Sequence, residues 1–171
     1  MKNFKISHLF AAVAFVAVLA CTGCAQEEEA ASFAIEGTWV STTGEKFVIE
    51  GSDYDNYSHW YVDNNGQWQE DDTKWYLSFS TNNIEIDEID ETSGYVYGQF
   101  DDKKHLGYGA ELGDWYAFYY FDLKEDRVKI SQAAGPKFAC KTLEEAKKTF
   151  TVKNGYMGKD KDQYSSCKRV N

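Results

Sequence analysis

Short stretches in which apolar and polar residues alternate recur from residue 38 onward, each bounded by residues that favour turns. The apolar positions are mostly Tyr, Trp, Phe, Val and Ile, which are the residue types that β-strands favour. Pairs such as Thr43-Gly44 and Asn82-Asn83 supply turn chemistry between the stretches. The pattern predicts eight strands, at residues 38–42, 45–50, 54–62, 73–80, 84–89, 95–101, 114–122 and 127–132.

The alternation also assigns faces within two of these strands. Trp75, Leu77 and Phe79 point one way and the residues between them point the other way, because successive side chains of a strand alternate. In residues 115–121 the side chains on both faces of the strand are apolar, which is typical of a strand that is covered on both faces. We therefore expect another element to cover this strand from outside.

A single amphipathic helix is predicted in the C-terminal part, at residues 142–150. Thr142 and Glu145 have the spacing of a capping box, which marks a helix start. The apolar residues of the segment fall on one stripe, formed by Leu143, Ala146 and Phe150. This stripe is the candidate cover for the doubly apolar strand.

These elements predict an all-β fold. A meander of eight strands leaves two unpaired edges, and closing the sheet into a barrel removes them. We therefore expect a single antiparallel up-and-down barrel of about eight strands with one short C-terminal helix, in one domain at residues 35–171. Segments 151–153 and 164–170 are expected to add a final short strand.

The N-terminal residues have a different character. Lys2 and Lys5 precede an uncharged apolar run at residues 9–20, which together form the pattern of an export signal. The run is shorter than the roughly 20 residues that a membrane-spanning helix needs. We expect a lipoprotein signal peptide at residues 1–23 and then a flexible acidic tether at residues 24–34, which is too polar to order itself.

Two cysteines, Cys21 and Cys24, follow the apolar run after small residues. This arrangement resembles the bacterial lipoprotein signal, in which a cysteine is acylated and becomes the new N-terminus. The aliphatic Val18 favours Cys21, whereas the cysteine count favours Cys24, because cleavage there leaves Cys140 and Cys167 to pair in an oxidising compartment. We take Cys24 as the lipidation site and predict a disulfide between the two later cysteines. A soluble secreted protein is the alternative.

The expected location is therefore the bacterial cell envelope, with the lipid anchored in a membrane outside the cytoplasm. The chain has 28 acidic and 18 basic residues, for a formal net charge of −10. Such a domain repels phosphate backbones, so we expect no nucleic-acid partner, whereas a basic protein or a neutral glycan would be tolerated. The acidic runs lack the spacing of a calcium loop, and no metal or other cofactor is expected. Known catalytic motifs are missing from the sequence, and we expect no enzyme activity.

The tripeptide Gly37-Thr38-Trp39 stands at the entrance of the first strand of this predicted meander. It is similar to the Gly-x-Trp signature of the lipocalins and their calycin relatives, and the whole chain resembles a small bacterial lipocalin-like lipoprotein. The resemblance implies that Gly37 and Trp39 form the plug of one barrel end, beneath a basic residue from near the C-terminal strands. Arg127 and Arg169 are the candidates. The second motif of the family, Thr-Asp-Tyr, has no match in this sequence.

A barrel of about eight strands can hold one small ligand or be filled by its own side chains, and both alternatives are open. Residues 101–113 form a long connector, in which Leu106 and Tyr108 are candidates for a lid. If a cavity exists, we expect aromatic residues to line it, namely Trp60, Trp75, Phe79, Tyr97 and Tyr119.

Three functions fit a tethered monomer of this kind. The first is a lipocalin-like barrel that binds a small apolar or aromatic ligand, and this is our principal expectation. The second is an acidic surface lipoprotein that binds a basic protein, as an adhesin or as an enzyme inhibitor. The third is a module that stacks glycans on Trp60 and Trp68. A cavity with a mouth would favour the first function, and exposure of those two rings the third.

Overall fold

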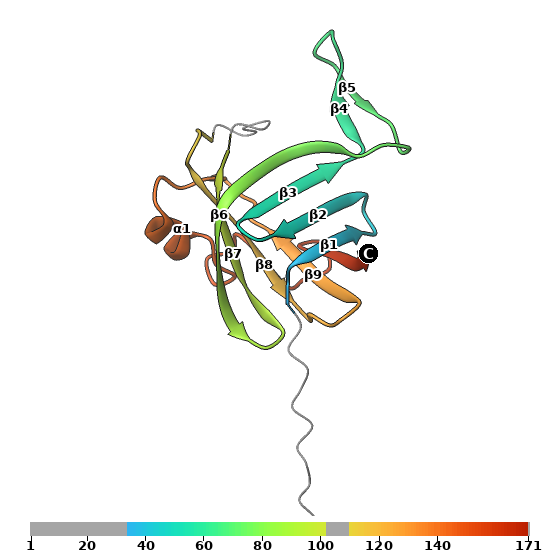
Figure 1. Cartoon of the computed structure of the whole chain (residues 1–171). Helices are drawn as coiled ribbons and strands as arrows, with labels where there is room; N and C mark the ends of the chain where they lie inside the picture. Colours follow the sequence, from blue (N-terminus) through green and yellow to red (C-terminus); the bar gives the residue numbers. More distant parts are fainter. Residues whose placement is uncertain (1–33, 102–109, 171) are drawn as a thin grey trace, which may run out of the picture. The chain divides into compact units, whose positions relative to one another are not determined.

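The computed structural model describes residues 34–101 and 110–170, which form a closed antiparallel barrel (Figure 1). Eight strands build the wall of the barrel, and they alternate in direction around it. Their bounds are β1 Gly37–Ser41, β2 Glu45–Glu50, β3 Asp53–Ser58, β6 Tyr76–Asp90, β7 Ser93–Phe100, β8 Trp115–Phe121, β9 Arg127–Gln132 and β10 Ser165–Val170. A separate hairpin is formed by β4 Trp60–Val62 and β5 Trp68–Glu70.

Each wall strand pairs with the wall strand that follows it in the chain, and β1 pairs with β10 to close the ring. The register of the closing pair sets Trp39 opposite Arg169 and Ser41 opposite Cys167. The fold class predicted from the sequence is therefore confirmed: a single up-and-down barrel of eight strands with one short helix.

The strand boundaries differ from the prediction in three places. Segments 73–80 and 84–89 were expected to be separate, but they merge into the long β6, with an irregularity in its pairing to β7 at Asn82 and Glu85. Asn83 adopts a φ of 49° there, so the chain kinks without turning back. Segment 54–62 instead divides into β3 and β4, and 151–153 forms a turn after the helix.

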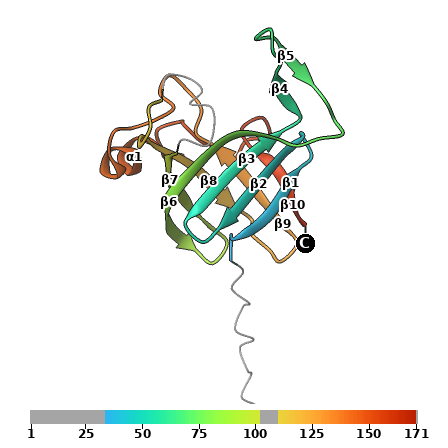
Figure 2. The same cartoon turned by 45° about the horizontal axis from the view of Figure 1, so that its top comes forward.

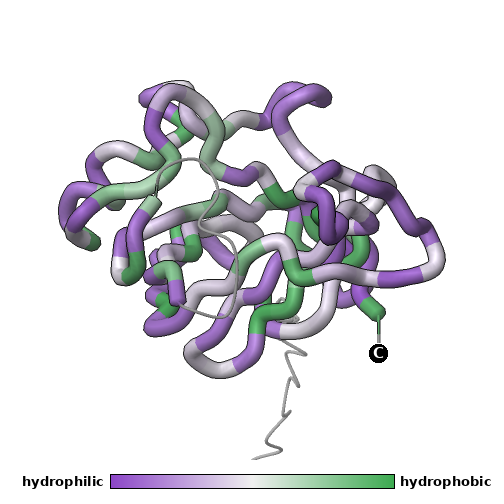
Figure 3. Tube along the Cα trace, turned by 90° about the horizontal axis from the view of Figure 1, so that it is seen from above, coloured by the Kyte–Doolittle hydropathy of each residue, from purple (hydrophilic) through white to green (hydrophobic). Residues whose placement is uncertain are grey.

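Aromatic side chains from opposite walls fill much of the barrel interior. Tyr54 of β3 and Phe118 of β8 have ring centroids 4.8 Å apart, although these strands are not neighbours in the wall. Phe79 packs edge-on against both Tyr54 and Tyr116. Figure 3 shows hydrophobic and hydrophilic residues interspersed along the chain, seen from above. Burial of such rings is the main source of stability in a small barrel.

The helix α1, Leu143–Thr149, covers the outer face of β7 and β8, as the doubly apolar pattern of residues 115–121 predicted (Figure 2). Ala146 and Phe150 of its apolar stripe are fully buried. The Thr142 hydroxyl accepts a hydrogen bond from the Glu145 backbone amide at 3.2 Å, which caps the first turn.

Candidate functional site

One end of the barrel is closed by Trp39. Its indole is fully buried and donates from Nε1 to the Ile35 carbonyl at 2.8 Å. The Arg169 guanidinium lies over the ring, with its carbon 4.1 Å from the centroid, and donates to the carbonyls of Ala34 and Glu36. The plug implied by the resemblance is thus present, and Arg169 covers it.

Gly37 makes the close approach of this arginine possible. Its φ of 131° is a conformation that residues with a side chain rarely adopt, and a Cβ at this position would collide with Nη1 of Arg169. The second candidate, Arg127, is instead exposed and pairs with Asp126.

The opposite end of the barrel, here called the mouth, carries the long connectors. Only short turns, at 51–52, 91–92 and 122–126, join strands at the end closed by Trp39. Within the described residues, the mouth carries the other connectors, among them the β4–β5 hairpin and the segment with α1. Long loops on a rigid scaffold are where binding residues concentrate, so the mouth is the first place to look for a site.

A chain of hydrogen bonds crosses the mouth from one wall to the other. The Tyr116 hydroxyl donates to Oε1 of Gln132 at 3.0 Å, and Nε2 of Gln132 donates to Oε1 of Glu45 at 2.7 Å. Ser165 donates to the other oxygen of Glu45 at 2.8 Å and also contacts the Thr43 hydroxyl. We call these five residues the mouth network.

Two polar groups lie among these side chains without hydrogen-bond partners in the described part of the chain. They are the Tyr54 hydroxyl and Nδ2 of Asn56, and both side chains are more than nine-tenths buried. Burial raises the pKa of Tyr54 well above its usual value, and the nearby Tyr116 and Glu45 raise it further, whereas the adjacent Asn56 side chain opposes the shift without making a hydrogen bond of ordinary geometry. The hydroxyl therefore remains a protonated donor at any physiological pH.

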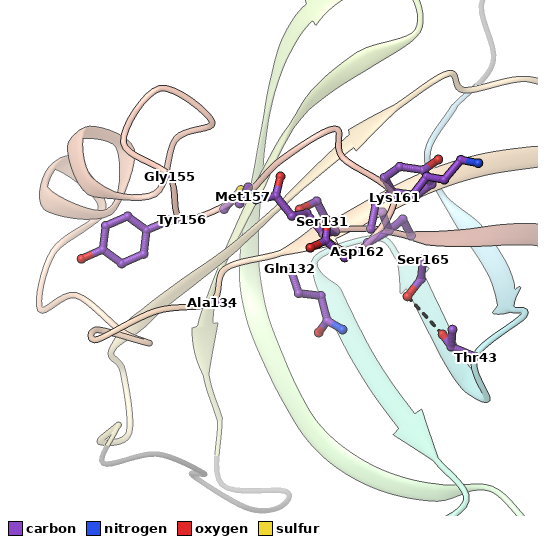
Figure 4. Close-up of a pocket in the computed structure, with 13 residues that line it drawn as sticks. Thr43, Ser131, Gln132, Ala134, Gly155, Tyr156, Met157, Lys161, Asp162 and Ser165 are labelled. Atoms are coloured by element: carbon purple, nitrogen blue, oxygen red, sulfur yellow. Dashed lines mark hydrogen bonds between the residues drawn. The ribbon is translucent and has the colours of Figure 1, made fainter.

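A pocket of about 450 Å³ opens beside the mouth network, between the ends of β9 and β10 and the segment 155–164 (Figure 4). Thr43, Gln132 and Ser165 of the network form part of its lining. Tyr156 and Met157 contribute apolar surface. Its volume lies within the range of small-molecule sites, and its lining combines apolar area with a few fixed polar groups.

The five aromatic residues expected to line a cavity do not form one site. Phe79 alone points into the barrel, where it packs among Tyr54, Phe100 and Tyr116. Trp75 stacks on His59 at the base of the hairpin, and Trp60 is 47% exposed on the hairpin itself.

Tyr97 and Tyr119 lie on the outer face of the wall. The ammonium groups of Lys147 and Lys159 each stand 5.5 Å from one of these rings. The expectation that these two tyrosines point inward was wrong, because β7 and β8 are buried on both faces and alternation cannot distinguish the two sets. Leu106 and Tyr108, the expected lid residues, lie outside the described residues, as does Cys24.

The predicted disulfide is not formed, since Cys140 and Cys167 are both free thiols. Residues that face each other across an antiparallel pair share one face of the sheet. Cys140 faces Trp115 on the outer side beneath α1, whereas Cys167 faces Ser41 and Val128 on the inner side. The barrel wall therefore separates the two sulfur atoms.

The sequence pattern did not reveal Tyr54, Asn56, Gln132 and Glu45 as site residues. These polar residues occupy inward-facing positions of β2, β3 and β9. Polar residues at such positions indicate a site, but which positions face inward could be decided only once the register of the strands was known. Within residues 34–101 and 110–170, no cluster of His, Cys, Asp or Glu could hold a metal ion, and no helix is long and apolar enough to cross a membrane.

The closed eight-strand barrel, with its plugged end and its mouth, is compatible with a lipocalin-like fold. Comparison with known proteins adds no relative: no family model, no curated protein and no solved structure matches this chain.

Proposed function

We propose that this chain is a lipocalin-like lipoprotein of the bacterial cell envelope that binds a small apolar or aromatic ligand at the mouth of its barrel. The ligand lies in the pocket beside Gln132 and Ser165. One polar atom of the ligand reaches past the mouth network to the Tyr54 hydroxyl and the Asn56 amide. The protein acts by binding rather than by catalysis, and it needs no cofactor.

The observation that carries this proposal is the pair of buried groups without partners, the Tyr54 hydroxyl and the Asn56 amide. A buried donor without a partner costs about 1–3 kcal/mol, and a ligand atom that accepts from it removes that cost. Both groups can donate, so the matching ligand atom is an acceptor such as a carbonyl oxygen. The Glu45 carboxylate close by disfavours an anionic ligand, and the surrounding rings favour an aromatic or apolar body.

The experiment is a thermal-shift screen with uncharged aromatic ketones, aldehydes and amides. A ligand present at 100 times its Kd stabilises the folded state by about 2.7 kcal/mol, which gives a clear rise in Tm. Tyr54→Phe and Asn56→Ala should each weaken binding of the hit about tenfold or more, because each removes one donor. Tyr61→Phe, on the hairpin, is the matched control and should leave binding unchanged.

A panel in which no compound shifts the Tm would contradict the proposal. So would a hit whose affinity is the same for Tyr54→Phe and for Asn56→Ala as for the unaltered protein. Tyr54→Phe removes only a hydroxyl that has no partner, so the variant should fold with stability equal to or above that of the original.

The predicted lipid anchor is tested separately, by substitution of each candidate cysteine. Cys24→Ala should block acylation, because it removes the residue that would carry the acyl chains. The protein should then be released from membranes, since stable attachment needs more than one acyl chain. If Cys21→Ala abolishes acylation while Cys24→Ala leaves it intact, then Cys21 is the lipidated residue.

A further inference from the structure

The β4–β5 hairpin extends away from the barrel and carries exposed aromatic residues (Figure 1). Register sets Trp60 opposite Glu70 and Val62 opposite Trp68, so these four side chains share one face of the two-stranded sheet. Trp68 is 67% exposed, Trp60 47% and Val62 40%. We call this surface the hairpin face.

The other face of the hairpin holds it in a fixed position. Tyr61 stacks on Tyr76 of β6 with ring centroids 4.6 Å apart, and His59 stacks on Trp75 at 4.1 Å. The His59 carbonyl also accepts from the Asp71 amide at 2.9 Å. An isolated two-stranded hairpin is marginally stable in water, so these contacts help to order the hairpin while its tryptophans stay exposed to solvent.

Asp63 and Asp71 flank the strands of the hairpin, and local structure occupies both carboxylates. Oδ1 of Asp63 accepts from the backbone amides of Asn65 and Gln67, which shapes the turn. Oδ1 of Asp71 accepts from the amide and the hydroxyl of Thr73. Glu70 is then the one charged residue among the four of the hairpin face.

The charge of the hairpin and its exposed aromatic rings favour one class of partner over others. A lipid surface of anionic headgroups or a nucleic acid is repelled by the acidic hairpin, since residues 59–74 contain four acidic residues and one lysine. A basic protein would need several carboxylates that converge on the aromatic rings, whereas the hairpin face offers one. A neutral sugar needs an aromatic plane for its C–H face and acceptors at the edge for its hydroxyls, and Trp68, Trp60 and Glu70 supply both.

We propose that the hairpin face is a second binding site, which takes a neutral hexose polysaccharide. Pyranose rings of the polymer stack on Trp60 and Trp68, and Glu70 accepts hydrogen bonds from ring hydroxyls. The site is independent of the mouth pocket, because the residues of the two sites do not overlap.

Native affinity electrophoresis tests this directly, with the folded protein run through gels that contain a mixed-linkage β-glucan, a galactomannan or dextran. At least one neutral polymer should retard the protein. Trp68→Ala and Trp60→Ala should each weaken retardation by roughly fivefold or more, and the double variant should abolish it, because truncation of a central tryptophan typically costs more than 1 kcal/mol of binding. Ile89→Ala, which alters an equally exposed apolar residue away from the hairpin, should change nothing.

Three results would overturn the inference. The first is that no neutral polymer retards the protein. The second is retardation that survives in the double variant, which would place the sugar elsewhere. The third is Trp-dependent binding to a basic protein or to neutral phospholipid vesicles with no response to any polysaccharide. Far-ultraviolet circular dichroism of each variant separates lost binding from lost folding, and Tyr54→Phe should bind the polymer normally whatever its effect at the mouth.

Discussion

Arg169 lies directly over Trp39, its partner in the register of β1 and β10, and its guanidinium carbon stands 4.1 Å from the indole centroid. The same guanidinium group donates to three backbone carbonyls, those of Ala34, Glu36 and Glu125. One side chain therefore joins the entrance of the first strand, the turn before β9 and the last strand. Its contacts reinforce the β1–β10 pairing that closes the barrel.

Arg169→Ala should lower the free energy of unfolding by about 1–3 kcal/mol, because it removes a cation–π contact and leaves the carbonyls to water. Trp39→Ala should cost about 3–5 kcal/mol, as expected for a large buried ring. Urea denaturation measures both. Arg127→Ala is the control and should stay within about 0.5 kcal/mol of the original.

Gly37→Ala should destabilise the barrel although it adds a single methyl group. The backbone φ of 131° is strained for alanine, and the new Cβ would displace Nη1 of Arg169. We expect a loss of about 1–3 kcal/mol, measured by thermal unfolding. Gly135→Ala has a closely similar φ of 139° and only ordinary van der Waals contact with Tyr156 at its Cβ, so it measures the backbone contribution. Equal losses in the two variants would show that contact with the arginine is unimportant.

The two described cysteines should behave as inert thiols. Burial raises the pKa of Cys167 to about 12, and burial also raises that of Cys140. Because the thiolate is the reactive form, a maleimide added at neutral pH should label neither residue in the folded protein and both after unfolding. Mass spectrometry of the tryptic peptides reads out the labels. A peptide pair linked through these residues would contradict the structure.

Alkaline pH should destabilise the fold through buried tyrosines. Burial raises the pKa of Tyr120 to about 12 from a usual value of 10.0, and it also raises the pKa values of Tyr54 and Tyr97. The raised pKa means that the contribution of Tyr120 to stability is constant below pH 10, where its hydroxyl is protonated in both the folded and the unfolded state. It falls as pH rises from 10.0 toward about 12, since only the unfolded state then loses the proton.

Tyr120→Phe should flatten this alkaline decline relative to the unaltered protein, with unfolding followed by circular dichroism. Tyr61→Phe is the comparison, because Tyr61 lies on the hairpin outside the barrel. If the two variants lose stability with pH at the same rate, burial of Tyr120 does not control the transition.

Alternation of apolar and polar residues was sufficient to predict the strands of the barrel, while the capping box and the apolar stripe predicted the helix, and the doubly apolar pattern of residues 115–121 predicted the strand that the helix covers. It succeeded for β1 and β2, where one face is buried and the other is not. It failed at Asn82 and Asn83, because turn residues can also be accommodated as an irregularity within a continuous strand. The hairpin was missed because its strands are three residues long and exposed, which leaves little periodicity to detect.

The site was harder to predict than the fold. The mouth network joins Thr43, Glu45, Tyr116, Gln132 and Ser165, which lie far apart in the sequence and meet only when the barrel closes. The wrong assignment of Tyr97 and Tyr119 has a related cause. Composition suggests that many tyrosines surround a cavity, but only register decides which side of a wall each one faces.

The direction in which the chain enters the barrel has a consequence for access. Ala34 and Glu36 are fixed by Arg169 at the end plugged by Trp39, whereas the mouth pocket and the hairpin lie at the other end. The described chain therefore enters the barrel at the end remote from both candidate binding surfaces. Residues 34–36 obstruct neither surface, so a ligand can reach the mouth and the hairpin without displacing the start of β1.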